Sequence, residues 1–178
     1  MTIDLVAVRS FDISYPNYTV GYKKSLCGHN RCMKKMVFVC IGTTRVVGDS
    51  VGPRVGDMLR ARGVKAYVYG TTAHQITSLN VAEYANMLAR RHPNDLVIVV
   101  DSTLGKLEDV GKIKLTDQGI LPGGAFSSKR KRIGDIGVMA IVGESDSDRM
   151  LELKTRDEKF VQEMAEKAFK VLTGTDFN

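Results

Sequence analysis

The chain has 178 residues, of which 43% are hydrophobic and 26% are charged, and its formal net charge at neutral pH is +6. This length suits one domain with a substantial core, and the composition is typical of a globular protein rather than a disordered one. Its apolar runs are only about six residues long, far short of the ~20 that a membrane-spanning helix needs. Residues 1–10 also lack the pattern of a signal peptide. We therefore expect a cytoplasmic protein with no membrane partner.

Residues 1–35 have the least regular pattern, so we predict an N-terminal arm or extension there and a single α/β domain over residues 36–178. Within the arm, Cys27, His29 and Cys32 are three candidate zinc ligands. A structural zinc site takes four ligands, and no second pair follows at a suitable spacing. An exposed segment without metal is therefore favoured.

The first regular element is the apolar run of residues 36–41, which predicts a strand buried on both faces. Residues 42–48 then predict a loop at the carboxyl end of that strand. An apolar face recurring over residues 50–62 predicts a helix, for which Asp49 is a good N-cap and Gly63 a good stop.

Strands and helices continue to alternate along the chain. The pattern predicts strands over residues 65–69, 96–100, 110–115 and 135–142, and helices over residues 79–92 and 155–172. Residues 119–125 form a turn-rich excursion that could lie over a site. Such alternation favours a three-layer α/β fold, with a mostly parallel sheet and helices on its faces.

Two aspartates follow predicted strand ends, Asp49 after the first loop and Asp101 directly after the run 96–100. Because the carboxyl ends of parallel strands meet at one edge of a sheet, we expect the two side chains to lie close together. A close carboxylate pair shares a proton, and one member can act as base while the other acts as acid. Alternatively the pair could hold a divalent metal, or Asp49 could be no more than a helix cap. His74 follows a predicted strand, but an exposed polar role is favoured for it.

A basic run covers Lys129–Arg132. A solvated loop is the favoured interpretation, and attraction to an acidic partner is the alternative. Since no aromatic residues are interleaved with the basic ones, a nucleic-acid partner is disfavoured.

Several motifs occur in a recognisable order. They are Val39–Thr43, Gly48–Pro53, Tyr69–Thr71, Asn80, Asp101 with Leu104 and Gly105, residues 119–125 around Pro122, Gly134–Ile136, and Thr155 with Arg156. Over about residues 36–172 the sequence resembles the YyaC-type sporulation protein family, relatives of the spore germination protease. The resemblance implies the phosphorylase/hydrolase-like α/β fold that hydrogenase maturation proteases share.

The resemblance also implies site residues. The catalytic aspartates of the germination protease match Asp49 and Asp101. In the hydrogenase maturation proteases, the positions that match Asp49 and Asp101 carry acidic ligands that recognise nickel, together with a histidine. This chain has no histidine in the corresponding segment. We therefore expect neither metal nor cofactor. Residues expected to shape or support the substrate cleft are Gly42, Thr43, Gly48, Gly105, Gly123 and Asp135.

From this resemblance we expect a spore-associated peptidase of the cytoplasm, forespore or spore core, which cleaves proteins such as small acid-soluble spore proteins. One alternative is an inactive module that binds an acidic partner through its basic surface. Another is a metal-dependent hydrolase of the same fold. The sequence leaves open whether the protein forms a homo-oligomer.

Overall fold

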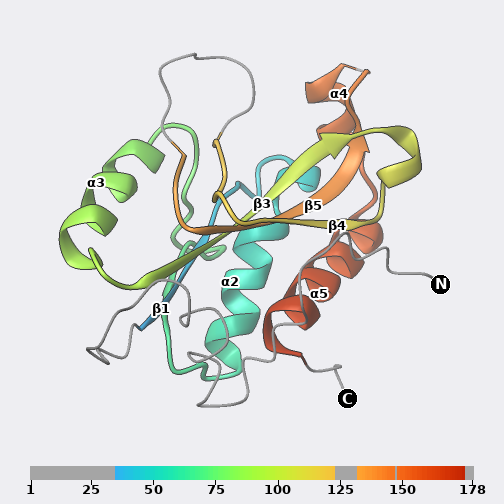
Figure 1. The fold of residues 1–178 in the computed structure, drawn as a ribbon. Helices are drawn as coiled ribbons and strands as arrows, with labels where there is room; N and C mark the ends of the chain where they lie inside the picture. Colours follow the sequence, from blue (N-terminus) through green and yellow to red (C-terminus); the bar gives the residue numbers. More distant parts are fainter. Residues whose placement is uncertain (1–34, 123–131, 147, 175–178) are drawn as a thin grey trace.

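The computed structural model describes residues 35–122, 132–146 and 148–174 (Figure 1). The predicted N-terminal arm thus lies outside the described residues, except for Lys35. The elements in chain order are β1 (Met36–Cys40), η1 (Val47–Asp49), α2 (Val51–Ala61), β2 (Tyr67–Tyr69), α3 (Val81–Arg91), β3 (Leu96–Gly105), η2 (Leu107–Asp109), β4 (Ile113–Thr116), β5 (Ile136–Glu144), α4 (Arg149–Lys154) and α5 (Glu158–Thr173).

The strands form one five-stranded sheet in the order β2-β1-β3-β5-β4. β2, β1, β3 and β5 run parallel to one another, and β4 is antiparallel to β5. The helices α2 and α3 lie in the crossovers that join the first three strands, as the alternation of elements predicted. The predicted α/β fold with a mostly parallel sheet is confirmed.

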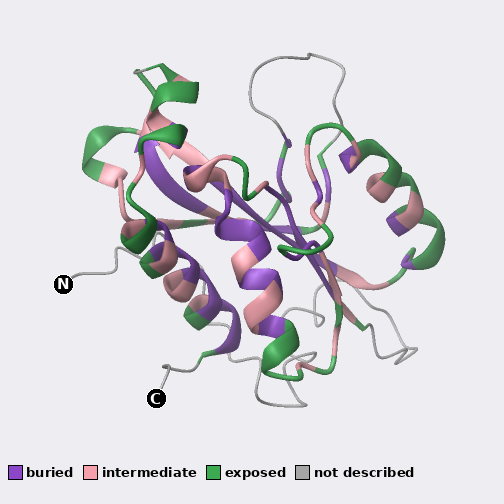
Figure 2. Cartoon of the chain, turned by 180° about the vertical axis from the view of Figure 1, so that it is seen from behind, coloured by how far each residue is buried: buried purple, intermediate pink, exposed green. Residues whose placement is uncertain are grey.

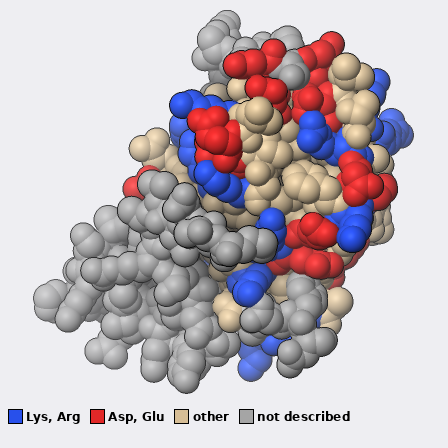
Figure 3. Space-filling view, turned by 90° about the vertical axis from the view of Figure 1, so that its right-hand side faces the viewer, with Lys and Arg blue, Asp and Glu red and all other residues tan. Residues whose placement is uncertain are grey.

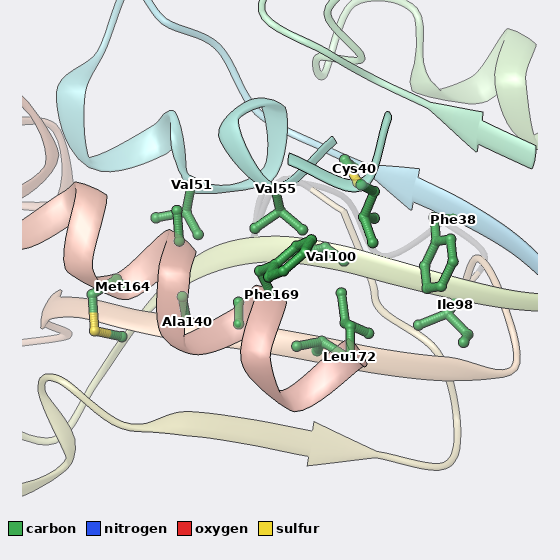
Figure 4. Packing of buried hydrophobic residues seen from close by; sticks show 14 of the residues in the cluster. Phe38, Cys40, Val51, Val55, Ile98, Val100, Ala140, Met164, Phe169 and Leu172 are labelled. Carbon is green, nitrogen blue, oxygen red and sulfur yellow. The ribbon is translucent and has the colours of Figure 1, made fainter. Parts of the chain in front are cut away.

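One face of the sheet is covered by α2 and α5 (Figure 1). Phe169 and Leu172 of α5 pack toward Ile98 and Val100 of β3, with Met164 on the same helix face (Figure 4). The apolar face predicted for the last helix is therefore buried in the core. At about 25 cal/mol per Å² of buried apolar surface, this layer is a main source of the fold's stability.

The opposite face of the sheet carries a second apolar cluster. Val37, Val39 and Val99 lie in it with Ile76 and with Leu88 of α3. The central strands are thus buried on both sides, as the purple colouring between the helices shows (Figure 2). Burial on both faces explains why these strands have continuous apolar runs rather than alternating ones.

Some element bounds differ from the sequence prediction. α4 was not predicted, because a helix of six residues has too few turns to show a periodic pattern. α5 begins at Glu158 rather than at residue 155, since the carboxylate of Asp157 accepts a hydrogen bond from Phe160 N and caps the helix there. No helix within the described ranges has the length and apolar character of a membrane span.

Candidate active site

Asp49 lies in η1, between β1 and α2, and its carboxylate faces the loop that follows β1. The Thr43 N–H donates to Asp49 Oδ2 at 3.0 Å and to the Asp49 carbonyl oxygen at 3.1 Å. The N-cap of α2 is Ser50, whose side chain makes no capping bond. The prediction that Asp49 caps the helix is wrong, because the 3-10 turn separates Asp49 from the helix start. Its carboxylate is instead turned toward the sheet edge.

Asp101 lies within β3, beside the end of β1. The Ile41 N–H donates to the Val100 carbonyl at 2.8 Å, which fixes the end of β1 against this part of β3. Asp101 is 9% exposed, and its Oδ1 accepts a 2.8 Å hydrogen bond from the Ser102 N–H. The strand was expected to end at Val100, but β3 continues to Gly105 because the extra residues pair with β5.

Ser102 joins the two aspartates. Its N–H donates to Asp101, and its hydroxyl donates to Asp49 Oδ1 at 3.3 Å. The two predicted site residues, 52 positions apart in the chain, are therefore brought to one place, as their positions after β1 and within β3 require. Sequence reasoning missed Ser102; the only signal was a hydroxyl residue directly after Asp101.

The surroundings of the two carboxyl groups favour a proton on one of them. Burial raises the pKa of Asp101 well above its usual value, and the neighbouring Asp49 charge raises it further. Burial also raises the pKa of Asp49, but the hydrogen bonds from Thr43 and Ser102 oppose that rise. The favoured arrangement near neutral pH is thus a protonated Asp101 beside an ionised Asp49.

Arg149, the first residue of α4, is a further charged group at the pair. Its positive charge lowers the pKa of both Asp49 and Asp101. The preceding Asp148 holds the helix start, because its carboxylate accepts hydrogen bonds from the Met150 and Leu151 N–H groups. Sequence reasoning did not single out Arg149, since the helix that carries it was not predicted.

A pocket of about 250 Å³ reaches Asp101 from the face of the sheet opposite α2 and α5. It lies over β3, β4 and β5 and is lined by Asp101, Ser102, Thr103, Lys114, Thr116, Gly119, Ile120, Leu121, Arg132, Met139 and Arg149. Among the described residues, the pocket therefore combines one buried carboxyl group with three basic side chains and several apolar ones.

Gly42 and Thr43, which were expected to shape the substrate cleft, lie beside Asp49, and neither lines the pocket. Gly42 has a φ of +141°, and a Cβ there would lie 2.0 Å from the Asp49 carbonyl oxygen. Only glycine allows the loop to approach Asp49 this closely. The side chain of Gln75 fixes the same loop, because it accepts from Thr43 Oγ1 and donates to Thr44 Oγ1, each at 2.7 Å.

The other expected glycines have different surroundings. A Cβ on Gly48 would lie 2.9 Å from the Leu153 carbonyl oxygen of α4, and one on Gly105 would lie 2.9 Å from Ile141 Cγ2 of β5. Both glycines thus allow close packing of the elements around the site, and neither lines the pocket. Gly123 lies outside the described residues.

Asp135 does not join the pair. It precedes β5, and its carboxylate accepts a 2.9 Å hydrogen bond from the Val97 N–H near the start of β3. The register places Asp101 opposite Met139, four residues further along β5. The expectation that Asp135 supports the catalytic carboxylates is wrong, because strand starts and strand ends lie at opposite edges of a parallel sheet.

For the alternative of a metal at the aspartate pair, the part of the chain that the structure describes offers no third ligand of the His, Cys, Asp or Glu type. Within it, no group of three or more His, Cys, Asp or Glu residues could hold a metal ion. His74 is exposed and does not line the pocket. Cys27, His29 and Cys32 lie outside the described residues, as does the basic run except for Arg132.

Comparison with known proteins agrees with this architecture. A family model described as "Protein of unknown function (DUF1256)" matches residues 13–171, so the match begins nearer the N-terminus than the expected 36–172. The uncharacterized protein YyaC of Bacillus subtilis is 33% identical over 144 residues, which cover 80% of this chain and 70% of YyaC. The crystal structure of the [NiFe] hydrogenase maturation protease HycI from Thermococcus kodakarensis is similar with a TM-score of 0.50 and 16% identity, covering 79% of this chain and 91% of HycI. The last likeness shows a shared fold.

Proposed function

This chain belongs to the DUF1256 family, and we propose that it is a peptidase that hydrolyses peptide bonds with the aspartate pair Asp49 and Asp101. One observation carries the proposal: Ser102 bridges the buried carboxylate of Asp101 and the half-buried carboxylate of Asp49, both with raised pKa values, at the edge of a pocket. Ionisable groups perturbed in this way cluster at catalytic sites. The fold shared with a maturation protease supports the same reaction class.

The proposed reaction uses the two carboxyl groups in complementary roles. Ionised Asp49 takes a proton from a water molecule as the water oxygen adds to the peptide carbonyl carbon, and Asp101 gives its proton to the carbonyl oxygen. The resulting gem-diol then collapses. Asp49 gives its proton to the leaving nitrogen as the C–N bond breaks, and one hydroxyl returns a proton to Asp101. The pair ends the cycle as it began.

The surrounding donors suit this division of roles. Ser102 and Thr43 donate hydrogen bonds to Asp49, which favours its ionised form. Asp101 accepts only the backbone bond of Ser102 on Oδ1 among the described residues, so Oδ2 can carry the proton. The positive charge of Arg149 lowers the pKa of both carboxyl groups, so it leaves Asp101 as the member with the higher pKa.

The test compares Asp49→Asn and Asp101→Asn with wild type in a cleavage assay on a mixed peptide library. Small acid-soluble spore proteins would be the first protein substrates, because the resemblance to the germination protease implies them. Each substitution should lower the cleavage rate by about 10²-fold or more, since it removes the acid or the base. Chelator should leave wild-type cleavage unchanged.

Asp135→Asn is the matched control, because it makes the same chemical change at the opposite edge of the sheet and keeps an oxygen to accept from Val97. It should cleave as wild type does. Full cleavage activity in folded Asp101→Asn would refute the proposed mechanism. Failure of folded wild type to cleave any substrate would favour the alternative of a spore protein that binds an acidic partner without cleaving it.

A further inference from the structure

The pocket beside Asp101 has an excess of positive charge. Lys114 of β4, Arg132 and Arg149 of α4 line it, and among the described residues Asp101 is its one acidic lining residue. With the proton of the pair on Asp101, that residue does not offset the three cations. The ionised Asp49 does not line the pocket.

None of the three cations forms an ion pair with a carboxylate within the described part of the chain, and the charge of Arg149 acts on Asp49 and Asp101 without such a contact. Arg132 donates one hydrogen bond, to the Gly119 carbonyl at 3.3 Å, and this bond leaves its charge unpaired. Guanidinium and ammonium groups in this state are the usual protein partners of carboxylates.

Neighbouring acidic side chains are committed elsewhere. Glu152 of α4 pairs with Arg156, and Asp148 caps α4. Asp109 pairs with Lys112 at 2.8 Å. The carboxylates of Glu152, Asp148 and Asp109 are therefore already engaged with other groups.

The side of the molecule that Figure 3 shows has no broad basic surface among the described residues. Figure 3 shows the side of the molecule that bears α4 and β4, where Lys and Arg groups alternate with Asp and Glu groups. A broad basic surface would attract any acidic polymer, whereas three cations around one pocket select a ligand group that enters it. The pocket volume of about 250 Å³ is below the ~300–1,000 Å³ of drug-sized ligand sites, which suits a short peptide segment.

From these observations we infer that the pocket binds a carboxylate of the peptide substrate, with Lys114, Arg132 and Arg149 as its partners. The inference rests on the proposed function in treating this pocket as the substrate site. The carboxylate belongs to a Glu or Asp side chain near the scissile bond or to the C-terminus of the peptide. Ile120, Leu121 and Met139 provide the apolar walls for the rest of that segment.

Binding can be measured separately from cleavage. The probes are the N-acetylated pentapeptide Ala-Ala-Glu-Ala-Ala and its Gln counterpart, each with a free or an amidated C-terminus, titrated calorimetrically into the full chain at low salt. The acidic probes should bind about tenfold more tightly than the neutral amidated one, because they gain charge-assisted hydrogen bonds. Arg149→Gln and Lys114→Gln should each reduce this preference, and added salt should weaken it.

Lys159→Gln is the control, since Lys159 is exposed on α5 at the opposite face of the sheet. This variant should keep the preference for the acidic probes.

If amidation of the C-terminus abolishes the preference, the C-terminal carboxylate is the bound group. If replacing Glu with Gln in the probe abolishes it, the bound group is the Glu side chain. Equal affinity for all four probes, or no binding of any, would overturn the inference, as would a preference that survives both pocket substitutions. A preference lost in the pocket variants, without cleavage of any peptide, would sustain the inference and refute the proposed peptidase.

Discussion

Ser102 links Asp49 to Asp101 through two different donors, its hydroxyl and its backbone N–H. At the scale of single residues, the aspartates themselves could be predicted, because each follows an apolar run that marks a buried strand. Ser102 and Arg149 could not. A serine after an aspartate is an ordinary sequence feature, and the approach of Arg149 depends on how α4 packs after β5.

Removing the Ser102 hydroxyl should disturb Asp49 before it disturbs the fold. Ser102→Ala deletes a donor that lowers the Asp49 pKa, so that pKa should rise. The acid limb of the pH–rate profile should then move to higher pH, and kcat should fall by roughly tenfold. Ser102→Thr, which keeps the hydroxyl, should restore the profile. Identical profiles for wild type and Ser102→Ala would show that this bond does not tune Asp49.

The buried carboxyl group of Asp101 should lower the free energy of unfolding at neutral pH. Its folded-state pKa is raised, so between the unfolded and folded pKa values the folded chain holds a proton that the unfolded chain has lost. Stability therefore falls as pH rises through this window, by about 1.4 kcal/mol for each pKa unit of difference. Asp101→Asn should unfold at higher denaturant concentration than wild type at pH 7, with a smaller difference near pH 4. A less stable variant at pH 7 would contradict this assignment.

At the scale of elements, the loop from Gly42 to Ser50 determines where Asp49 lies. Apolar runs predicted β1, β3 and β5, because burial on both faces leaves an uninterrupted hydrophobic signal. The continuation of β3 through Ser102 and Thr103 was not visible, since polar residues at a strand end resemble a turn. Pairing with β5 fixes those residues in the sheet, and that pairing is a long-range property.

Gly42→Ala should distort this loop. The added Cβ would meet the Asp49 carbonyl oxygen at 2.0 Å, and the φ of +141° is itself unfavourable for alanine. We expect a loss of about 2–3 kcal/mol in the free energy of unfolding, together with reduced cleavage. Gly63→Ala is the control, because Gly63 has a φ of +67° with nothing within 4 Å of the added Cβ. If chemical denaturation shows that Gly42→Ala and Gly63→Ala lose the same free energy of unfolding, the close approach of Gly42 to Asp49 does not contribute to the loss.

At the scale of the whole molecule, alternating strands and helices were enough to predict the mostly parallel α/β sheet. That prediction also brought Asp49 and Asp101 together, because β1 and β3 are neighbours in the sheet. The same prediction was wrong in placing Asp135 near the pair, because Asp135 directly precedes the first residue of β5. The basic pocket could not be predicted either, since Lys114, Arg132 and Arg149 come from three separate segments whose meeting depends on the packing of β4 and α4.

The most direct measurement is mass spectrometry of peptides digested in heavy-oxygen water by wild type, Asp101→Asn and Asp135→Asn. If the aspartate pair activates water, wild type and Asp135→Asn should produce fragments whose new C-termini carry one solvent oxygen, and folded Asp101→Asn should produce almost none. Labelled fragments from Asp101→Asn at the wild-type rate, or none from folded wild type, would contradict the account.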